Sequence, residues 1–210
     1  MKLFPLFLKL RSRKCLVVGA GSIAESKIAS LAETGAKVCV IAPDATPQVR
    51  AWARARRIAW RQRRFRVRDL KGVFLVIAAT SSRALQRQIF RAAQRLGVLC
   101  NVVDVPELCD FYYPAVVRRG ALQIAISTTG QSPALAQRLR KELQGQFGPE
   151  YEEWLESVGK VREEILARNL TAEQRKKFLH ELVSEEAFRK FRQHSETRDR
   201  RPHNRQKNGV

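Results

Sequence analysis

A glycine-rich turn, GAGSIA at residues 19–24, constrains the fold of this chain more than any other stretch. It follows a short apolar run at 15–18 and precedes a segment with helical periodicity. A strand, a GxGxxA turn and a helix in that order form a dinucleotide-binding fingerprint. In it Gly19 permits the tight turn, Gly21 lets the backbone approach a pyrophosphate, and Ala24 lets helix and strand pack closely. The sequence therefore predicts a nucleotide site at the N-terminus of this helix.

Further apolar runs alternate with helical periodicity. Strand-like runs occupy 37–41, 72–80 and 98–104, and the segment at 82–97 has helical spacing. Alternation at this length is typical of parallel strands joined by right-handed helical crossovers. We therefore expect an α/β fold, a Rossmann-like parallel sheet with helices on both faces, to about residue 112.

The pattern changes after that domain. Residues 113–127 read as two strands joined by a tight turn at Arg119 and Gly120, too few to be stable alone, so we expect them to join another sheet or a second subunit. Ser132 and Pro133 then mark the start of a helix. Helical spacing continues from residue 150, so the C-terminal third is predicted to be a small helical unit.

The predicted organisation has four parts. They are a nucleotide-binding domain at 1–112, a small domain at 113–147, a helical domain at 148–193 and a basic tail at 194–210. The composition of the tail is typical of disorder.

The charge of the chain is strongly positive. Lys and Arg number 40 against 20 Asp and Glu, giving a formal net charge of +20. This favours polyanionic partners but does not separate nucleic acid, a lipid surface and a polycarboxylate ligand. The densest basic stretch has no acid among its nine arginines, Arg50, Arg54, Arg56, Arg57, Arg61, Arg63, Arg64, Arg66 and Arg68.

Compartment and metal content follow from what the sequence lacks. No apolar stretch approaches the ~18 residues of a spanning helix. The N-terminal apolar run is broken by Pro5 and Lys9, without a cleavage site after it, so we expect a cytoplasmic protein and no membrane association. The four cysteines form no CxxC pair, and no cluster of His, Cys and acids has the spacing of a metal site, so we predict neither disulfides nor a tightly held metal.

The ribose partner of the fingerprint is ambiguous. The usual acid would end the second strand, at Ile41 or Ala42, but Asp44 comes two or three residues later, after Pro43. Either Asp44 reaches the ribose from the loop, or backbone groups of Pro43 and Asp44 contact the adenosine. No arginine follows the strand directly, which favours NAD over NADP.

Asp104 ends the fourth apolar run, at the edge where ligands bind in open α/β sheets. A carboxylate there can act as a general base or hold a metal ion transiently. A helix cap or turn ahead of Pro106 explains it equally well. Farther on, Ser127, Thr128 and Thr129 precede the Ser132 cap, where hydroxyls either bind an anion or cap the helix.

Three segments taken together resemble a known family. LFPLFLKLRSRKCLVVGAGSIAESKIASLAETGAKVCVIAPD, VIAATSS and CNVVDVPELCDFYYPAVVRRGALQIAISTTGQSPALAQRLRKEL occur here in that order. Their joint occurrence and spacing resemble precorrin-2 dehydrogenase / sirohydrochlorin ferrochelatase, the family that also forms the N-terminal part of siroheme synthase. The resemblance covers roughly residues 1 to 190.

The resemblance implies NAD-dependent oxidation of precorrin-2 to sirohydrochlorin in sirohaem biosynthesis, and in some members insertion of Fe(II). It implies a homodimer in which 113–147 is a dimerisation domain that exchanges strands. The family's key aspartate falls on Asp104, and its substrate contacts fall on Ser127 and Thr128. Cofactor contacts fall on Gly19, Gly21, Ser22, Ile23, Pro43, Asp44 and Thr80. Two departures are Ser81 and Ser82, where acids are common, and the unusually basic run at 50–68.

A tetrapyrrole with many carboxylates gives the positive charge one explanation, because arginine forms strong charge-assisted bonds. The alternative is a redox-sensing regulator that binds nucleic acid through its arginines. Trp52, Trp60 and Phe65 interleave with the arginines, which favours that alternative, but no helix-turn-helix signature accompanies them. We therefore expect a tetrapyrrole substrate and no nucleic acid partner.

Overall fold

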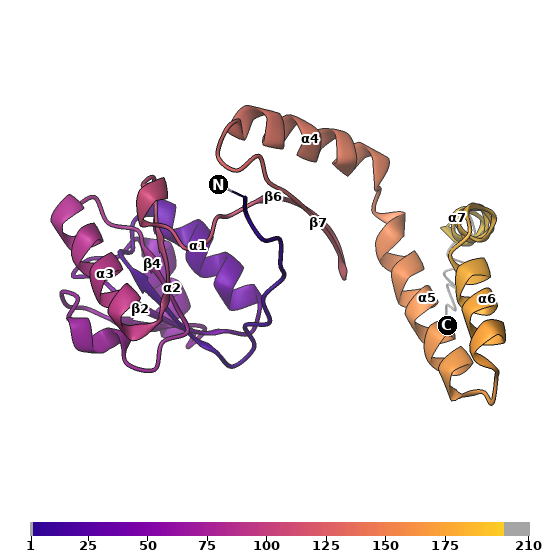
Figure 1. Ribbon diagram of the computed structural model, residues 1–210, viewed down its shortest axis with the longest axis horizontal. Helices are drawn as coiled ribbons and strands as arrows, with labels where there is room; N and C mark the ends of the chain where they lie inside the picture. The colour runs from indigo at the N-terminus through magenta and orange to yellow at the C-terminus, as the bar shows by residue number, and fades with distance from the viewer. Residues whose placement is uncertain (1, 200–210) are drawn as a thin grey trace, which may run out of the picture. The chain divides into compact units, whose positions relative to one another are not determined.

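The computed structural model describes residues 2–199, with side chains to residue 194. The chain divides into two compact units between Tyr113 and Pro114, and each is described by itself (Figure 1). The predicted finer boundaries at 147/148 and 193/194 stay predictions.

The first unit is built on a parallel sheet of five strands in the order β3-β2-β1-β4-β5. The order reverses direction around β1, which is the topology of a nucleotide-binding α/β fold. The predicted Rossmann-like class is therefore confirmed. The strands are β1 (Lys14–Val18), β2 (Lys37–Ile41), β3 (Ala59–Arg61), β4 (Leu75–Ala78) and β5 (Leu99–Val102).

Helices cover both faces of this sheet because the strands bury apolar side chains on alternating sides. On one face α1 (Ser22–Glu33) and α2 (Pro47–Arg54) pack against Val17 and Val40. On the other, α3 (Arg83–Leu96) and the 3-10 helix η1 (Val67–Leu70) pack against Leu16. Figure 1 shows the helices on either side of the strands.

Besides the two 3-10 helices, one helix and one strand of the first unit are not predicted by the residue patterns. They are α2 and the edge strand β3, which pairs with β2 from Cys39–Ala59 to Ile41–Arg61. The sheet therefore has five strands where four apolar runs were found. The unit ends with the short 3-10 helix η2 (Pro106–Leu108) after β5.

The second unit begins with the predicted hairpin. Strands β6 (Ala115–Arg119) and β7 (Leu122–Ile126) pair only with each other within the described residues, and α4 (Pro133–Gln146) packs on them. Arg119 secures the packing, since its guanidinium donates to the Gln144 and Phe147 carbonyls at 2.9 and 2.8 Å. Strand exchange with a second subunit stays a prediction.

Three helices complete the second unit: α5 (Glu150–Ala167), α6 (Ala172–Leu182) and α7 (Glu185–Asp199). Thr171 and Gln174 form the predicted capping box of α6. Helix α7 continues past residue 194, where the tail was predicted to begin, and the rest of that tail, 200–210, lies outside the described residues. Across 2–199 no helix is long and apolar enough to span a bilayer.

Candidate active site at the carboxyl edge of the sheet

The glycine turn connects β1 to α1 through backbone contacts that only glycine allows. Gly19 has a φ of +110°, and its N–H donates to the Ile41 carbonyl at 2.9 Å. A Cβ on Gly19 would overlap the carbonyl oxygen of Ala79, at the end of β4. The turn therefore lies tightly between the ends of β2 and β4, where φ above zero favours glycine.

The N-terminus of α1 lacks a side-chain cap. Its N-cap is Gly21, whereas Thr46, Ser82 and Ser132 accept backbone N–H bonds at the starts of α2, α3 and α4. A Cβ on Gly21 would meet nothing within 4 Å, so space is open above the turn. An uncapped helix start facing open space fits a pyrophosphate, because the first N–H groups of a helix need an acceptor. The exposed Ser22 and Ile23 follow directly.

The loop after β2 holds the predicted ribose contacts. Pro43 and Asp44 are both exposed. The loop is tied to the glycine turn, because the Thr46 N–H donates to the Ala20 carbonyl at 3.1 Å. Asp44 therefore lies on a loop that is anchored beside the turn.

Thr80 lies next to Gly19 from the β4 side, since its nitrogen would be 3.4 Å from a Cβ on that glycine. Its carbonyl accepts from the amide of Gln86, a buried side chain, at 2.7 Å. The Thr80 hydroxyl accepts from the Ser82 N–H at 3.4 Å. The loop after β4 is thus held by its own hydrogen bonds next to the turn.

Asp104 follows β5 in a left-handed backbone conformation, with a φ of +60°. The preceding residue, Val103, still donates to the Ala78 carbonyl of β4 at 3.1 Å. The 3-10 helix after it has Val105 as its N-cap, without a side-chain cap. Asp104 therefore forms a turn but does not cap this helix, and it presents an exposed side chain beyond the end of β5.

Sequence reasoning missed Lys27, which interacts with Asp104, and Tyr113, which contacts Lys27. Desolvation lowers the pKa of Lys27 on α1, and the charge of Asp104 partly opposes this by raising it. The Lys27 ammonium lies 3.8 Å from the centre of the Tyr113 ring, a cation–π contact. The pKa of Tyr113 is raised, chiefly by desolvation and further by Cys15, while a hydrogen bond with Ser30 lowers it.

One sequence signal could have identified Lys27. It lies three residues after the buried Ala24 and directly before the buried Ile28, so it borders the packed stripe of α1. A lysine at that border places its stem on apolar surface and its ammonium at the sheet edge.

Ser127 and Thr128 belong to the second unit, in the loop between β7 and α4. The Thr128 hydroxyl accepts from the Ser132 N–H at 3.2 Å and donates to the Ser132 carbonyl at 3.1 Å. The Ser127 hydroxyl accepts from the Thr129 N–H at 3.2 Å. Both hydroxyls are used locally to shape the turn before α4, and their predicted substrate contacts stay predictions.

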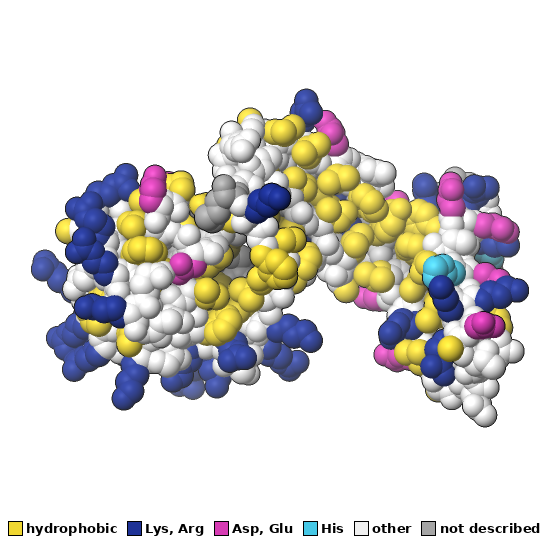
Figure 2. All heavy atoms as spheres, viewed as in Figure 1, with side chains coloured by type: hydrophobic (Ala, Val, Ile, Leu, Met, Phe, Trp, Pro, Cys, Tyr) yellow, Lys and Arg dark blue, Asp and Glu magenta, His cyan; other side chains and the backbone are white. Residues whose placement is uncertain are grey.

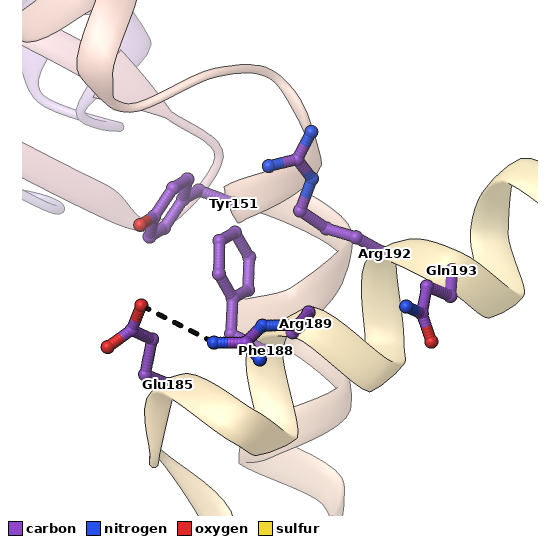
Figure 3. Close-up of a pocket in the computed structure, with 6 residues that line it drawn as sticks. All are labelled: Tyr151, Glu185, Phe188, Arg189, Arg192 and Gln193. Atoms are coloured by element: carbon purple, nitrogen blue, oxygen red, sulfur yellow. Dashed lines mark ion pairs between the residues drawn. The ribbon is translucent and has the colours of Figure 1, made fainter.

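Two surface cavities lie outside this set of residues. One, of about 460 Å³, is on the second unit, with Tyr151, Phe188 and the Glu185–Arg189 ion pair among its walls (Figure 3). The other, of about 380 Å³, lies on the first unit between Arg83, Arg87 and Val105. The second cavity is lined by Val105, which directly follows the predicted catalytic residue Asp104.

The basic run at 50–68 includes most of α2, the edge strand β3 and the start of η1. Between Asp44 and Asp104 the sequence has a single acid, Asp69. Arg63 binds its carboxylate with two bonds of 2.7 and 2.8 Å, and the Arg66 N–H adds a third at 2.8 Å. These bonds, led by the one from Arg63, lower the pKa of Asp69. Figure 2 shows Lys and Arg side chains gathered along the margin of the visible face of this unit.

The cysteines are all free thiols. Cys15, Cys39 and Cys100 lie in strands, as predicted. Among the described residues no group of three or more His, Cys, Asp or Glu is arranged to hold a metal ion.

Two segments of the chain match family models. Residues 6–115 match the model of an NAD(P)-binding family, and residues 119–146 match the model of the central part of sirohaem biosynthesis proteins. Neither describes a nucleic-acid regulator, so that alternative gains no support.

The chain is also similar to individual proteins. Siroheme synthase of Nitrosococcus oceani is 40% identical over 161 residues, which cover 72% of this chain and 34% of that protein. Siroheme synthase of Neisseria meningitidis serogroup C is 36% identical over 178 residues, which cover 85% of this chain and 37% of that protein. The chain thus spans about a third of the length of these curated relatives.

A solved structure extends the similarity to most of the chain. It is described as SirC, precorrin-2 dehydrogenase, with a TM-score of 0.75 and 25% identity over 93% of this chain and 100% of that one. The chain therefore belongs to the NAD(P)-binding family, and its residues 119–146 match the central part of sirohaem biosynthesis proteins, in agreement with the resemblance found in its sequence.

Proposed function

We propose that this protein oxidises precorrin-2 to sirohydrochlorin with NAD as the hydride acceptor. The name of the similar structure, precorrin-2 dehydrogenase, supports this activity, and the relatives named siroheme synthase support the pathway. The observation that carries the proposal is that an uncapped glycine turn and the Asp104 carboxylate occur at the same edge of one parallel sheet.

The chain's own residues bind and orient the dinucleotide. The first N–H groups of α1, at Ser22 and Ile23, donate to the pyrophosphate, and Gly21 leaves room for it. Asp44 accepts from the ribose hydroxyls, and Thr80 lines the site from β4. When bound, NAD supplies a carbon that accepts a hydride.

Asp104 takes the proton that the tetrapyrrole loses as the hydride leaves. Its position at the edge, on a backbone held by β4 and β5, sets the carboxylate without a competing cap. Lys27 lies close enough for the two charges to interact, and its ammonium can bind a substrate carboxylate beside the base. Ser127 and Thr128 are proposed as further substrate contacts.

The test is anaerobic incubation of the purified protein with precorrin-2 and NAD, following NADH formation and the tetrapyrrole spectrum. Asp104→Asn should lower the rate about 10²- to 10⁴-fold, the usual range for a general base. Asparagine tolerates the left-handed conformation, so the fold should survive. Glu107→Gln, at an exposed position three residues on, is the matched control. Dinucleotide binding without NADH formation from precorrin-2 would exclude the proposed activity.

The proposal includes a homodimer, located in the cytoplasm. The dimer is supported by exposed apolar side chains: Phe4, Leu6 and Phe7 are 84%, 57% and 68% exposed. Figure 2 also shows hydrophobic side chains across the visible face of β6, β7 and α4. Sedimentation equilibrium should give twice the chain mass, and a monomer at micromolar concentration would exclude the dimer.

Fe(II) insertion stays a prediction. It is tested by adding Fe(II) to sirohydrochlorin with the wild type, Asp104→Asn and Glu107→Gln.

A further inference from the structure

Arg50 is held against the loop that follows β2. Its Nε donates to the Ala45 carbonyl at 2.9 Å, and its guanidinium lies 5.8 Å from the centre of the Trp60 ring. The Trp60 indole N–H in turn donates to the Ala42 carbonyl, at the end of β2, at 3.1 Å. A long, exposed side chain is thus fixed at two points beside Asp44, which reduces the entropy it would lose on binding a ligand.

This loop is where the adenosine ribose lies in folds of this class. An acid after the second strand binds the 2′-hydroxyl of NAD, and an arginine near it accommodates the 2′-phosphate of NADP. A guanidinium has five N–H donors in a planar fork suited to phosphate. The bond to Ala45 uses the Nε donor, so the Nη donors are not needed to hold the side chain on the loop.

Other arginines at this end of the sheet are directed elsewhere. Arg63 makes its paired bonds to Asp69, and Nη1 of Arg61 lies 4.0 Å from the same carboxylate. Arg61 is opposite Ile41 in the β2–β3 register, so its side chain lies on the α3 side of the sheet with Ile41. Arg50, on α2, lies on the α1 side with the loop.

We propose that Arg50 binds a 2′-phosphate on the adenosine ribose, so that the site accepts NADP as well as NAD. The inference rests on the proposed dinucleotide site, and it adds a specificity residue that lies outside the fingerprint and the β2 end. Asp44 serves the ribose hydroxyls of NAD, and Arg50 serves the phosphate. The other arginines of the run at 50–68 further favour the negative charge of the 2′-phosphate.

The experiment is a fluorescence titration of the full-length protein with NADH and with NADPH at fixed ionic strength. The wild type should bind the two within about tenfold of each other. Arg50→Gln should lower the affinity for NADPH by about tenfold or more, as expected for a lost charge-assisted pair. It should lower the affinity for NADH by less than about twofold. Arg54→Gln, one turn along α2 and also exposed, should change neither.

The outcomes separate the inference from the function beneath it. If the wild type binds NADH but not NADPH, the role of Arg50 is overturned and the dinucleotide site stands. The same conclusion follows if Arg50→Gln and Arg54→Gln lose NADPH affinity equally. Binding of neither cofactor overturns both. Competition by 2′-AMP against 5′-AMP should show the same dependence on Arg50, because 2′-AMP retains the phosphate in question.

Discussion

Gly19 and Ala79 lie against each other at the carboxyl edge of the sheet, with no room for a side chain between them. A Cβ on Gly19 would overlap the Ala79 carbonyl, and the φ of +110° already disfavours any other residue. Gly21, two residues on, has an ordinary φ of −81° and open space above it. The two glycines therefore have different roles, one in the fold and one in the site.

Substitution of the two glycines should separate those roles. Gly19→Ala should lower the free energy of unfolding by about 2–5 kcal/mol, from backbone strain and overlap. Gly21→Ala should change it by less than about 1 kcal/mol, yet weaken NADH binding by about tenfold or more, because the methyl group occupies the space needed by the pyrophosphate. Urea unfolding and NADH titration of both variants measure this, and equal stability losses would contradict it.

The interaction of Asp104 with Lys27 should be visible in the titration of the lysine. Asp104 raises the Lys27 pKa against a larger lowering by desolvation. Asp104→Asn should therefore move the pKa of Lys27 further below its usual value, so that the neutral amine appears at lower pH. NMR titration of ¹³C-methylated lysines measures it. Glu25→Gln, on the same helix, serves as the control and should leave the Lys27 resonance unchanged.

Asp69 should make stability depend on acid pH. Because its pKa is lowered in the folded state, its contribution is complete above the unfolded value of about 3.9 and is lost as pH falls through the folded value. Wild type should exceed Asp69→Asn in urea unfolding free energy at pH 6, and the gap should narrow below about pH 4. A gap that stays constant from pH 6 to pH 3 would argue against the Arg63–Asp69 pair.

The strand cysteines should resist alkylation. Burial raises the pKa of Cys15 to about 11 and that of Cys100 to about 12. At pH 8 a thiol with a pKa near 11 is thiolate in only about one part in a thousand, and the thiolate is the reactive form. Iodoacetamide labelling of the folded protein should therefore be slow at both positions and fast after unfolding in guanidinium. Peptide mapping that finds either residue modified first would contradict this.

The sequence predicts the sheet where burial dictates composition. Strands β1, β2 and β5 are fully apolar apart from their ends and Asn101, because both faces of a covered parallel sheet exclude water. Strand β3 is Ala-Trp-Arg, half exposed at the edge, and it forms through pairing with β2 and the Trp60 bond to Ala42. A three-residue edge strand carries too little pattern to be found without its partner.

The residues of the candidate site also divide into those that the sequence predicts and those that it does not. The glycine turn and the position of Asp104 at a strand end are local, so they can be read from consecutive residues. Lys27 and Tyr113 are far apart in the chain, and only the packing of α1 brings them together. Arg50 was missed for a similar reason: in sequence it is one arginine among nine, and its two contacts distinguish it.

The left-handed backbone at Asp104 has a consequence for how this protein loses function over generations. Asparagine and glycine are the residues that accept this conformation most readily, and each is a single nucleotide change away from every aspartate codon. On the proposed catalytic role of Asp104, its substitution by either residue should therefore yield inactive chains that still fold and accumulate. Such alleles would lower the activity without lowering the amount of protein, and they would escape any screen that measures abundance alone.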